Sequence, residues 1–530
     1  MTLPLLAILV LLVLTAGYVL YGTLIGRFYR LDDSATTPAV ARADGTDFVP
    51  TRPFYLLPQH FSAIAAAGPI AGPILACGTF GWLPCLLWIG FGVIFIGAVH
   101  DFSALVASVR HGSHSIAEIT KQNLGRRAWL SLSIFIWLAL VYVIVAFTQM
   151  TAASFVGISE ELEGIGGTFN KGGAVAASSV MYLLLSLTMG LITKFFRPPL
   201  WLVTPVFVAA TLACVWLGTR LDTVLVFSAQ TWFIAILGYC LVASMLPVWL
   251  LQQPRGYLGG FVLYLAIGIG VVGILAGGFS IRQPMVSDQA ARLLDPLAAL
   301  RLTDSAGSGA VTQMVVPFLF VTIACGACSG FHGLICGGTT SKQIAKESHC
   351  KPVAFGAMLL EGFVAVIALA TMMMLSPAEA KGLPPARIYG DGLASFLTVM
   401  LGKDAFLFAS TFGAMAFSTF VFDTLDVSTR LGRYLLQEVF GAPSKPAGWI
   451  ASLVTAATPL TILLTSDPKG YLLYWTLFGT SNQLLAALTL LGITVWLRRA
   501  GKRSWFVAIP MLFLMGITLS ALAMQIAAGF

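Results

Sequence analysis

Apolar stretches long enough to cross a membrane recur along the whole chain of 530 residues. A helix needs about 20 apolar residues to span the hydrocarbon core of a bilayer, and we count about fourteen stretches of that length. Charged residues make up only 10% of the chain, against roughly 25% in a soluble protein. The sequence predicts an all-α polytopic membrane protein that forms one integral membrane domain over residues 1–530. The stretches lie near residues 3–26, 58–78, 83–109, 128–156, 173–193, 199–218, 231–251, 257–280, 314–336, 353–376, 404–427, 447–465, 471–496 and 505–528.

The basic residues predict an orientation in the membrane. If the loops alternate and the N-terminus lies outside, 21 of the 30 Lys and Arg residues fall in inside loops. Such a bias is typical of the cytoplasmic side, so we expect both termini on the periplasmic side of a bacterial inner membrane. The same bias accounts for the net charge of +8, so a nucleic acid is not an expected partner.

Two of the apolar stretches are interrupted. The first, His60–Pro73, contains two Gly-Pro pairs, and each proline removes a backbone donor and clashes with the preceding helical turn. The second, Gly326–Gly338, holds five glycines in thirteen residues. Broken backbone at membrane depth needs partners from protein or from a water-filled cavity. Matching interruptions in two halves of a carrier indicate its substrate site. We therefore predict that both segments are unwound near mid-membrane and contact each other.

The two interrupted stretches also resemble each other. Phe61–Gly68 aligns with Phe331–Gly338 at an offset of 270 residues, which predicts an inverted structural repeat. The predicted substrate-binding residues lie in these stretches and in the span near 471–496. The two amides of that span could instead hold helices together, which is the commoner role of amides in membranes. The candidates are His60, Ser62, Gly68, Gly72, Ser329, Gly330, His332, Asn482 and Gln483.

Several ionisable residues lie inside predicted spans, where a charge is costly and normally faces a functional cavity. Asp426 is four residues before Arg430, which is the spacing of a structural ion pair on one helix. Two alternatives are static contacts, one between His100 and Asp101 and one between Glu361 and His332. We predict that the other ionisable groups converge on one cavity and couple transport to protons, with at least one carboxyl titrating near neutral pH. This proton-coupling set is His100, Asp101, His332, Glu361 and Asp423.

A second hypothesis is a membrane metal-binding or redox protein. Its candidate metal ligands are His100, Asp101 and His332, and Cys325 and Cys328 have the spacing of a redox or metal motif. The alternative for the cysteines is that they are small apolar residues at a helix crossing. The sequence contains no nucleotide-binding loop and no enzyme signature, so we expect a non-enzyme driven by gradients. No cofactor is predicted apart from a possible bound metal ion.

Motifs along nearly the whole chain resemble those of the carbon starvation protein A (CstA) family of bacterial inner-membrane carriers. They include the interrupted stretches, Gly97–Phe102, Leu246–Leu250, Gly356–Glu361 and Leu477–Gln483. The resemblance implies a secondary carrier, used in carbon starvation, that imports peptides or pyruvate with protons across the lipid bilayer.

The resemblance also implies a fold similar to that of the amino acid–polyamine–organocation carriers, with two inverted five-helix repeats. We place these repeats at about 58–251 and 314–465, with accessory helices at both ends. The chain lacks the long C-terminal region of the longest members. It also carries His100 where some members have Gln, which leaves a family-wide role for His100 open.

Overall fold

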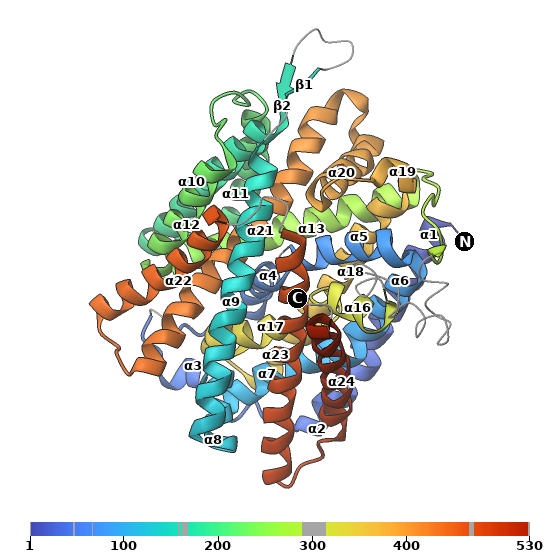
Figure 1. Cartoon of the computed structure of the whole chain (residues 1–530). Helices are drawn as coiled ribbons and strands as arrows, with labels where there is room; N and C mark the ends of the chain where they lie inside the picture. Colours follow the sequence, from blue (N-terminus) through green and yellow to red (C-terminus); the bar gives the residue numbers. More distant parts are fainter. Residues whose placement is uncertain are drawn as a thin grey trace.

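The computed structural model describes residues 2–45, 48–65, 67–156, 159–161, 168–288, 314–465 and 471–527. Within these residues, eleven helices are long and apolar enough to cross a membrane. A twelfth candidate span is the pair α4 (Pro53–Ile64) and α5 (Gly68–Phe80), which is bent by 42°. The predicted span near 231–251 is the shorter helix α12 (Ala229–Met245). The predicted span near 314–336 is interrupted between α16 (Val315–Thr322) and α17 (Gly330–Ile335). Every predicted stretch therefore contains helix, and the chain is an all-α polytopic membrane protein (Figure 1).

The remaining spans are continuous, although three of them contain a π-helical turn, at Gly17–Tyr21, Val93–Gly97 and Lys351–Gly356. They are α1–α2 (Leu3–Ala16 and Gly22–Tyr29), α6–α7 (Trp82–Gly92 and Ala98–Arg110), α9 (Arg126–Phe155), α10 (Lys171–Phe195), α11 (Leu200–Gly218), α13 (Gln252–Ala276), α18 (Ala357–Met373), α21 (Phe406–Phe440), α22 (Lys445–Thr465), α23 (Tyr471–Arg499) and α24 (Trp505–Ala527). The short elements are α3 (Pro38–Ala41), α8 (Ile116–Leu124), α19 (Pro377–Ala380), α20 (Pro385–Leu401) and the antiparallel strands β1 (Ser159–Glu161) and β2 (Thr168–Asn170).

Helix contacts in the first half of the chain have counterparts in the second half. The contact of α4 with α13 corresponds to the contact of α17 with α23. The contacts of α8 with α9 and α23 correspond to those of α20 with α21 and α13. Helices α9 and α21 contact each other at the centre, and α12 contacts α22. We propose that the two repeats run from α4 to α13 and from α16 to α23, with α10 and α11 as an added hairpin. Such repeats would extend past the predicted boundaries at residues 251 and 465.

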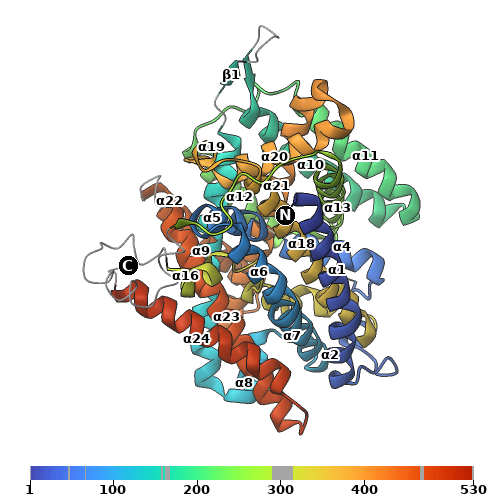
Figure 2. The same cartoon turned by 90° about the vertical axis from the view of Figure 1, so that its right-hand side faces the viewer.

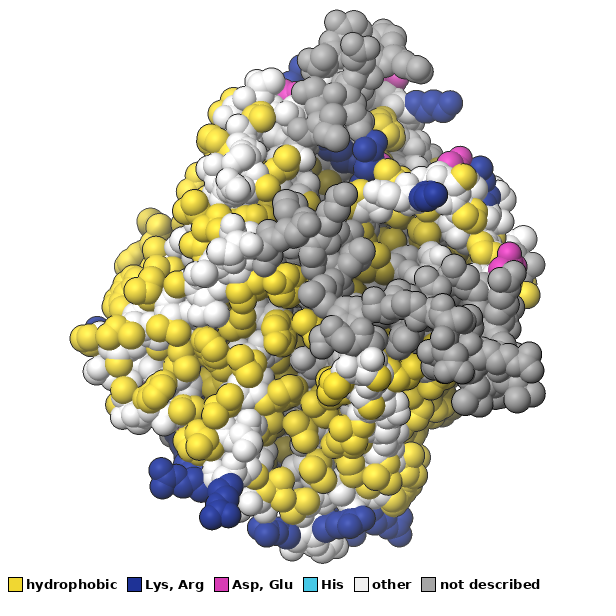
Figure 3. Space-filling view, in the orientation of Figure 1, with side chains coloured by type: hydrophobic (Ala, Val, Ile, Leu, Met, Phe, Trp, Pro, Cys, Tyr) yellow, Lys and Arg dark blue, Asp and Glu magenta, His cyan; other side chains and the backbone are white. Residues whose placement is uncertain are grey.

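Basic side chains line the lower end of the molecule in Figure 3, below an apolar belt, whereas the upper end carries both basic and acidic side chains. The helices α8, α2 and the start of α24 lie at this basic end, whereas α20 and the β-hairpin lie at the opposite end (Figures 1 and 2). Phe28 and Phe506 stack with their ring centroids 5.2 Å apart, which joins the end of α2 to the start of α24. The first residue of α1 and the last residue of α24 therefore lie away from the basic face. That this face is cytoplasmic stays a prediction from charge.

Residues 30–45 and 48–52, which we call the strap, lie across the basic end (Figure 1). At Thr51 the strap forms an isolated parallel β-bridge with Ile344, and the Thr51 N–H donates to the Gln343 carbonyl at 2.9 Å. Asp33 accepts hydrogen bonds from the backbone N–H and the hydroxyl of Ser348. These two bonds hold the pKa of the Asp33 carboxyl below its usual range. The strap thus ties the first span to the segment that follows α17.

Candidate functional site

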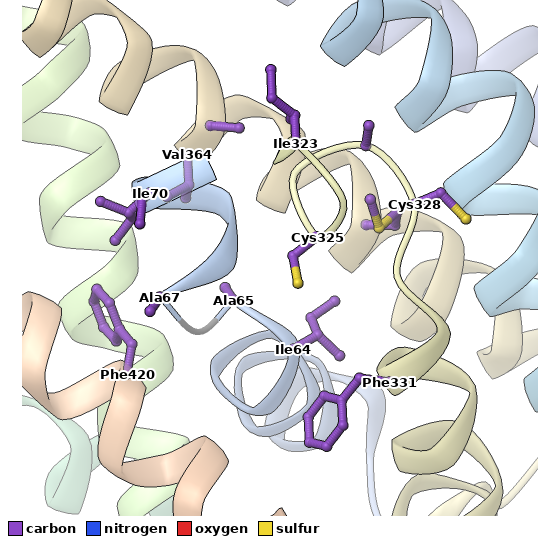
Figure 4. Close-up of a cluster of buried hydrophobic side chains, with 14 of the residues drawn as sticks. Ile64, Ala65, Ala67, Ile70, Ile323, Cys325, Cys328, Phe331, Val364 and Phe420 are labelled. Carbon is purple, nitrogen blue, oxygen red and sulfur yellow. The ribbon is translucent and has the colours of Figure 1, made fainter. Parts of the chain in front are cut away.

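The two interrupted spans cross each other inside the bundle (Figure 4). Helix α4 ends at Ile64 and α5 begins at Gly68, while the chain from Ile323 to Ser329 is irregular between α16 and α17. A Cβ atom added to Gly68 would overlap the side chain of Cys325, and one added to Gly72 would lie 2.7 Å from the Thr322 carbonyl oxygen. Only glycine permits this approach, so the contact predicted between the two interruptions is found.

Both interruptions are shorter than the predicted segments His60–Pro73 and Gly326–Gly338. His60 and Ser62 lie in α4, and the two Gly-Pro pairs lie inside α5. Pro69 occupies the first turn of α5, where its missing N–H has no helical partner to lose. Gly330–Gly338 is also helical, because α17 continues into a π-helical turn at Cys336–Thr340. The predicted unwinding was therefore wrong over most of both segments, and Ala66 itself lies outside the described residues.

Four of the predicted ionisable residues form a connected chain that we call the buried relay. One carboxylate oxygen of Asp101 lies 2.7 Å from His100 Nδ1, and the other lies 2.8 Å from His332 Nδ1. His332 Nε2 lies 3.3 Å from a carboxylate oxygen of Glu361. All four side chains have zero exposed surface. The relay therefore links α7, α17 and α18 at the crossing of the interrupted spans.

Both ends of the buried relay have unused hydrogen-bonding atoms. Within the described residues, neither His100 Nε2 nor either carboxylate oxygen of Glu361 has a hydrogen-bond partner. The 3.3 Å approach of His332 Nε2 to Glu361 is close enough for an ion pair but is not aligned as a hydrogen bond. Buried polar atoms are nearly always paired, so these unpaired atoms are unusual and leave hydrogen-bonding capacity at both ends of the relay.

Asp423 lies apart from the buried relay. Its carboxylate accepts a hydrogen bond of 2.8 Å from the Ser62 hydroxyl, and no direct contact joins it to the relay in the part of the chain that the structure describes. Asp423 lines a cavity of about 10 Å³, large enough for one water molecule, together with His60 and Thr340. His60 Nδ1 lies 2.8 Å from the Thr340 hydroxyl, and the His60 ring is within electrostatic range of Asp101. The structure thus shows two neighbouring polar centres instead of one.

The two amides of α23 hold the second interrupted span in place. The side-chain oxygen of Asn482 accepts hydrogen bonds from the Phe331 N–H at 2.9 Å and from the Ser329 hydroxyl at 3.2 Å. Gln483 donates to the Phe320 carbonyl at 2.7 Å. Gly330 packs so closely on the Asn482 carbonyl that a Cβ atom would not fit. A direct contact of these residues with substrate stays a prediction.

Asp426 pairs with Arg255, and the predicted pair with Arg430 was wrong. Arg255 lies in the first turn of α13 and is only 3% exposed, so its guanidinium reaches Asp426 inside the bundle. Tyr239 donates a second hydrogen bond of 2.7 Å to Asp426. Arg430 instead donates to the carbonyls of Ala243 and Leu246, which end α12 before a proline. Sequence reasoning placed Arg255 in a loop and so missed it.

A cavity of about 470 Å³, which we call the vestibule, lies at the basic end. It is lined by residues of the strap, α8, α9, α21 and the turn after α17. Gly337 and Gly338 line it directly after α17, so the vestibule reaches the base of the second interrupted span. Its lining contains both basic and acidic side chains. These are Arg42, His114, Lys342, Glu118 and Glu438, none of which the sequence reasoning selected.

The metal or redox hypothesis finds no support in these contacts. Among the described residues, no group of three His, Cys, Asp or Glu side chains is placed to hold a metal ion. Cys325 and Cys328 are free, buried thiols, and Cys325 lies beside Ser329 and Asn482 at the helix crossing. Their observed environment is that of small apolar residues in a packed crossing.

Comparison with known proteins places the chain in a family. The family described as "Carbon starvation protein CstA" matches residues 2–391 and 378–521. The chain belongs to this CstA family. The "Peptide transporter CstA" of Bacillus subtilis is 33% identical, over 95% of this chain and 87% of the relative. The "Pyruvate/proton symporter BtsT" of Escherichia coli is 28% identical, over 94% of this chain and 78% of the relative. This CstA-family protein is a secondary transporter of a bacterial membrane and not an enzyme.

Solved structures of other transporters are similar only in outline. MhsT in complex with L-phenylalanine is 15% identical, covers 91% of this chain and 99% of its own, and has a TM-score of 0.49. A manganese transporter of Eremococcus coleocola is 12% identical, covers 92% of this chain and 98% of its own, and has a TM-score of 0.41. At these scores the likeness carries no inference about the ligands of this CstA-family protein.

Proposed function

We propose that this CstA-family protein imports a small organic substrate together with protons, and that the buried relay carries the proton. The observation behind this proposal is the series of close contacts from His100 through Asp101 and His332 to Glu361, all fully buried. Imidazole exchanges protons near neutral pH, and a carboxylate between two imidazoles can receive a proton from one and pass it to the other. Ionisable chains at membrane depth are typical of proton-driven pumps and carriers.

The two ends of the relay suggest how proton and substrate are linked. Glu361 has no hydrogen-bond donor within the described residues, so its charged form is poorly stabilised and its protonated form is tolerated. His332 lies in α17, next to the irregular chain Ile323–Ser329. A movement of α17 during transport would change the distance between His332 and Glu361, and so change which of them holds the proton.

The vestibule is the proposed route to the basic side. It ends at the glycines after α17, and the crossing of the two interrupted spans closes the path beyond it. If the basic face is cytoplasmic, this is an inward-facing state in an inner membrane, with both termini on the periplasmic side. The opposite opening would then require α5 and the Ile323–Ser329 segment to separate.

The proposed substrates are peptides or pyruvate, which are the cargoes in the names of the two kinds of relative. A vestibule of about 470 Å³ is within the size range of small-molecule sites and accommodates either. Its mixed charges would suit the separated ends of a zwitterionic peptide. Pyruvate carries one carboxylate and needs only the cationic groups, so the two cargoes make different demands on Glu118 and Glu438.

Uptake into vesicles containing the purified protein tests this proposal. Labelled pyruvate, a dipeptide and a tripeptide would each be offered with and without an inward proton gradient. We expect one class to accumulate only with the gradient, and Asp101→Asn to reduce that accumulation at least tenfold, because it removes the anion shared by both histidines. Glu379→Gln, at an exposed surface position, is the matched control and should transport normally. Accumulation that ignores the proton gradient, or that survives Asp101→Asn, would reject the proposed coupling.

A further inference from the structure

A third cavity lies between α10 and α12, away from the buried relay and the vestibule. It has a volume of about 140 Å³ and is lined by α9, α10, α12, α13 and α21. Helices α10 and α12 both pack on α9 and α21 but have at most marginal contact with each other. Val180 and Ala235 line the cavity from these two helices and are exposed on the outer surface of the bundle. We call this space the lateral crevice, and the exposure of these two residues on the outer face of a membrane bundle means that it opens toward the lipid.

The walls of the lateral crevice are mostly aromatic. Phe155 contacts Trp232 edge to face with ring centroids 4.8 Å apart, and Phe155 stacks on Phe422 at 5.7 Å. Tyr239 meets Phe422 edge to face at 5.8 Å. Aromatic faces arranged in this way favour a flat ring between or beside them. A cavity of about 150 Å³ in another protein holds one benzene ring, so the lateral crevice has room for a single ring.

Two hydrogen-bond donors of the lining have no acceptor. Arg255 is 3% exposed and Trp232 is 6% exposed, yet Arg255 Nε and Trp232 Nε1 lack partners within the described residues. Both groups can only donate, so they need an acceptor such as a carbonyl oxygen. The other polar groups of the lining are already engaged, because the Ser179 hydroxyl bonds to Ser418 at 2.9 Å and the Tyr239 hydroxyl donates to Asp426 at 2.7 Å. A buried donor without an acceptor is unfavourable, and a ligand that supplies one would remove that penalty.

The charge of Arg255 is already balanced. Its Nη1 group pairs with Asp426 and donates to Tyr239 at 2.7 Å, while Nε has no acceptor within the described residues. The occupant therefore needs an acceptor but no charge of its own. A charged carboxylate would add an unpaired anion at membrane depth, where it is costly.

We propose that the lateral crevice binds a neutral, flat, carbonyl-bearing ring that enters from the lipid. The lipid-soluble class with this chemistry is the quinones, whose headgroup is a ring carrying carbonyl acceptors. The site is independent of the proposed proton relay, because none of its lining residues belongs to the relay or the vestibule. Asp426 nevertheless lies one helical turn from Asp423 on α21, so an occupant that moves Arg255 would act close to the polar centre at Ser62.

Fluorine NMR on the full-length protein in nanodiscs tests this inference. The probe is 4-fluoroacetophenone, and 1-ethyl-4-fluorobenzene is its match without a carbonyl. We expect the ketone to give a shifted fluorine resonance that saturates with concentration, and duroquinone to displace the ketone and remove this resonance. The hydrocarbon should bind at least tenfold more weakly than the ketone. Trp232→Phe, which removes one donor, should weaken ketone binding about tenfold, the value of one hydrogen bond.

Two tryptophan variants on α10 separate the lateral crevice from the general lipid surface. Val180→Trp fills the rim of the crevice and should abolish the resonance, while Leu184→Trp, exposed on the same helix but outside the lining, should leave it unchanged. Ala235→Phe blocks the crevice from α12 and replaces Val180→Trp should that variant unfold. Equal binding of ketone and hydrocarbon would mean an apolar cavity only. Either that result, or full binding in a blocked variant, would overturn the inference.

Discussion

Replacing Gly68 with alanine should destabilise the protein through one defined collision. The added Cβ would overlap Cβ and Sγ of Cys325, where the two interrupted spans cross. Inserting a methyl group into a closed core costs about 1–3 kcal/mol. Alanine regains up to about 1 kcal/mol over glycine inside a helix. We therefore expect Gly68→Ala to lower the free energy of unfolding by about 1–2 kcal/mol.

The assay is reversible denaturant unfolding of the purified protein, with a second substitution as the test of cause. Cys325→Gly removes both atoms that the new methyl group meets, so Gly68→Ala should cost nothing measurable in that background. Gly78→Ala on the same helix is the matched control, because its nearest neighbour is the flexible end of Met372 at 3.4 Å. The reasoning fails if Gly68→Ala and Gly78→Ala have equal effects, or if Cys325→Gly leaves the cost of Gly68→Ala unchanged.

Three further predictions follow from other contacts. Asp426→Asn should destabilise the protein by about 3–5 kcal/mol because Arg255 is left charged and unpaired, while Arg255→Met with Asp426→Leu should restore most of the loss in the same assay. Glu118→Cys, in the vestibule, should react with an impermeant maleimide only from the cytoplasmic side, and labelling from the other side would reverse the orientation. Hydrogen bonds from Ser348 lower the pKa of Asp33, so their contribution is complete above the ordinary Asp value of about 4 and is lost as pH falls further. Amide exchange in the strap should therefore accelerate only below about pH 4. Acceleration near pH 6 would mean that groups other than Asp33 hold the strap in place.

The membrane class and the members of the buried relay could be predicted from the sequence, because both follow from the cost of placing polar groups in hydrocarbon. Apolar length defines a span, and an ionisable group inside a span needs a partner, so His100, Asp101, His332 and Glu361 could be selected one by one. The length of each irregular segment could not be predicted, because Gly-Pro pairs occur in irregular chain and also, as Pro69 shows, in the first turn of a helix.

Long-range pairing was also hidden from the sequence. The ion pair between Arg255 and Asp426 joins residues 171 positions apart, while the local spacing favoured Arg430. The vestibule is likewise built from five separate segments that share no motif. Only the folded arrangement brings such residues together, so the order of residues along the chain does not predict these contacts.

The central claim is that Glu361 accepts and releases the transported proton, and Glu361→Gln tests it most directly. Glutamine keeps the shape of the side chain but cannot titrate. Vesicles containing the variant should lose proton-driven accumulation of substrate, while exchange of labelled for unlabelled substrate across the membrane continues at a rate close to that of the unmodified protein. If Glu361→Gln accumulates substrate at the unmodified rate and with the same pH dependence, Glu361 is structural and the buried relay does not couple transport to protons.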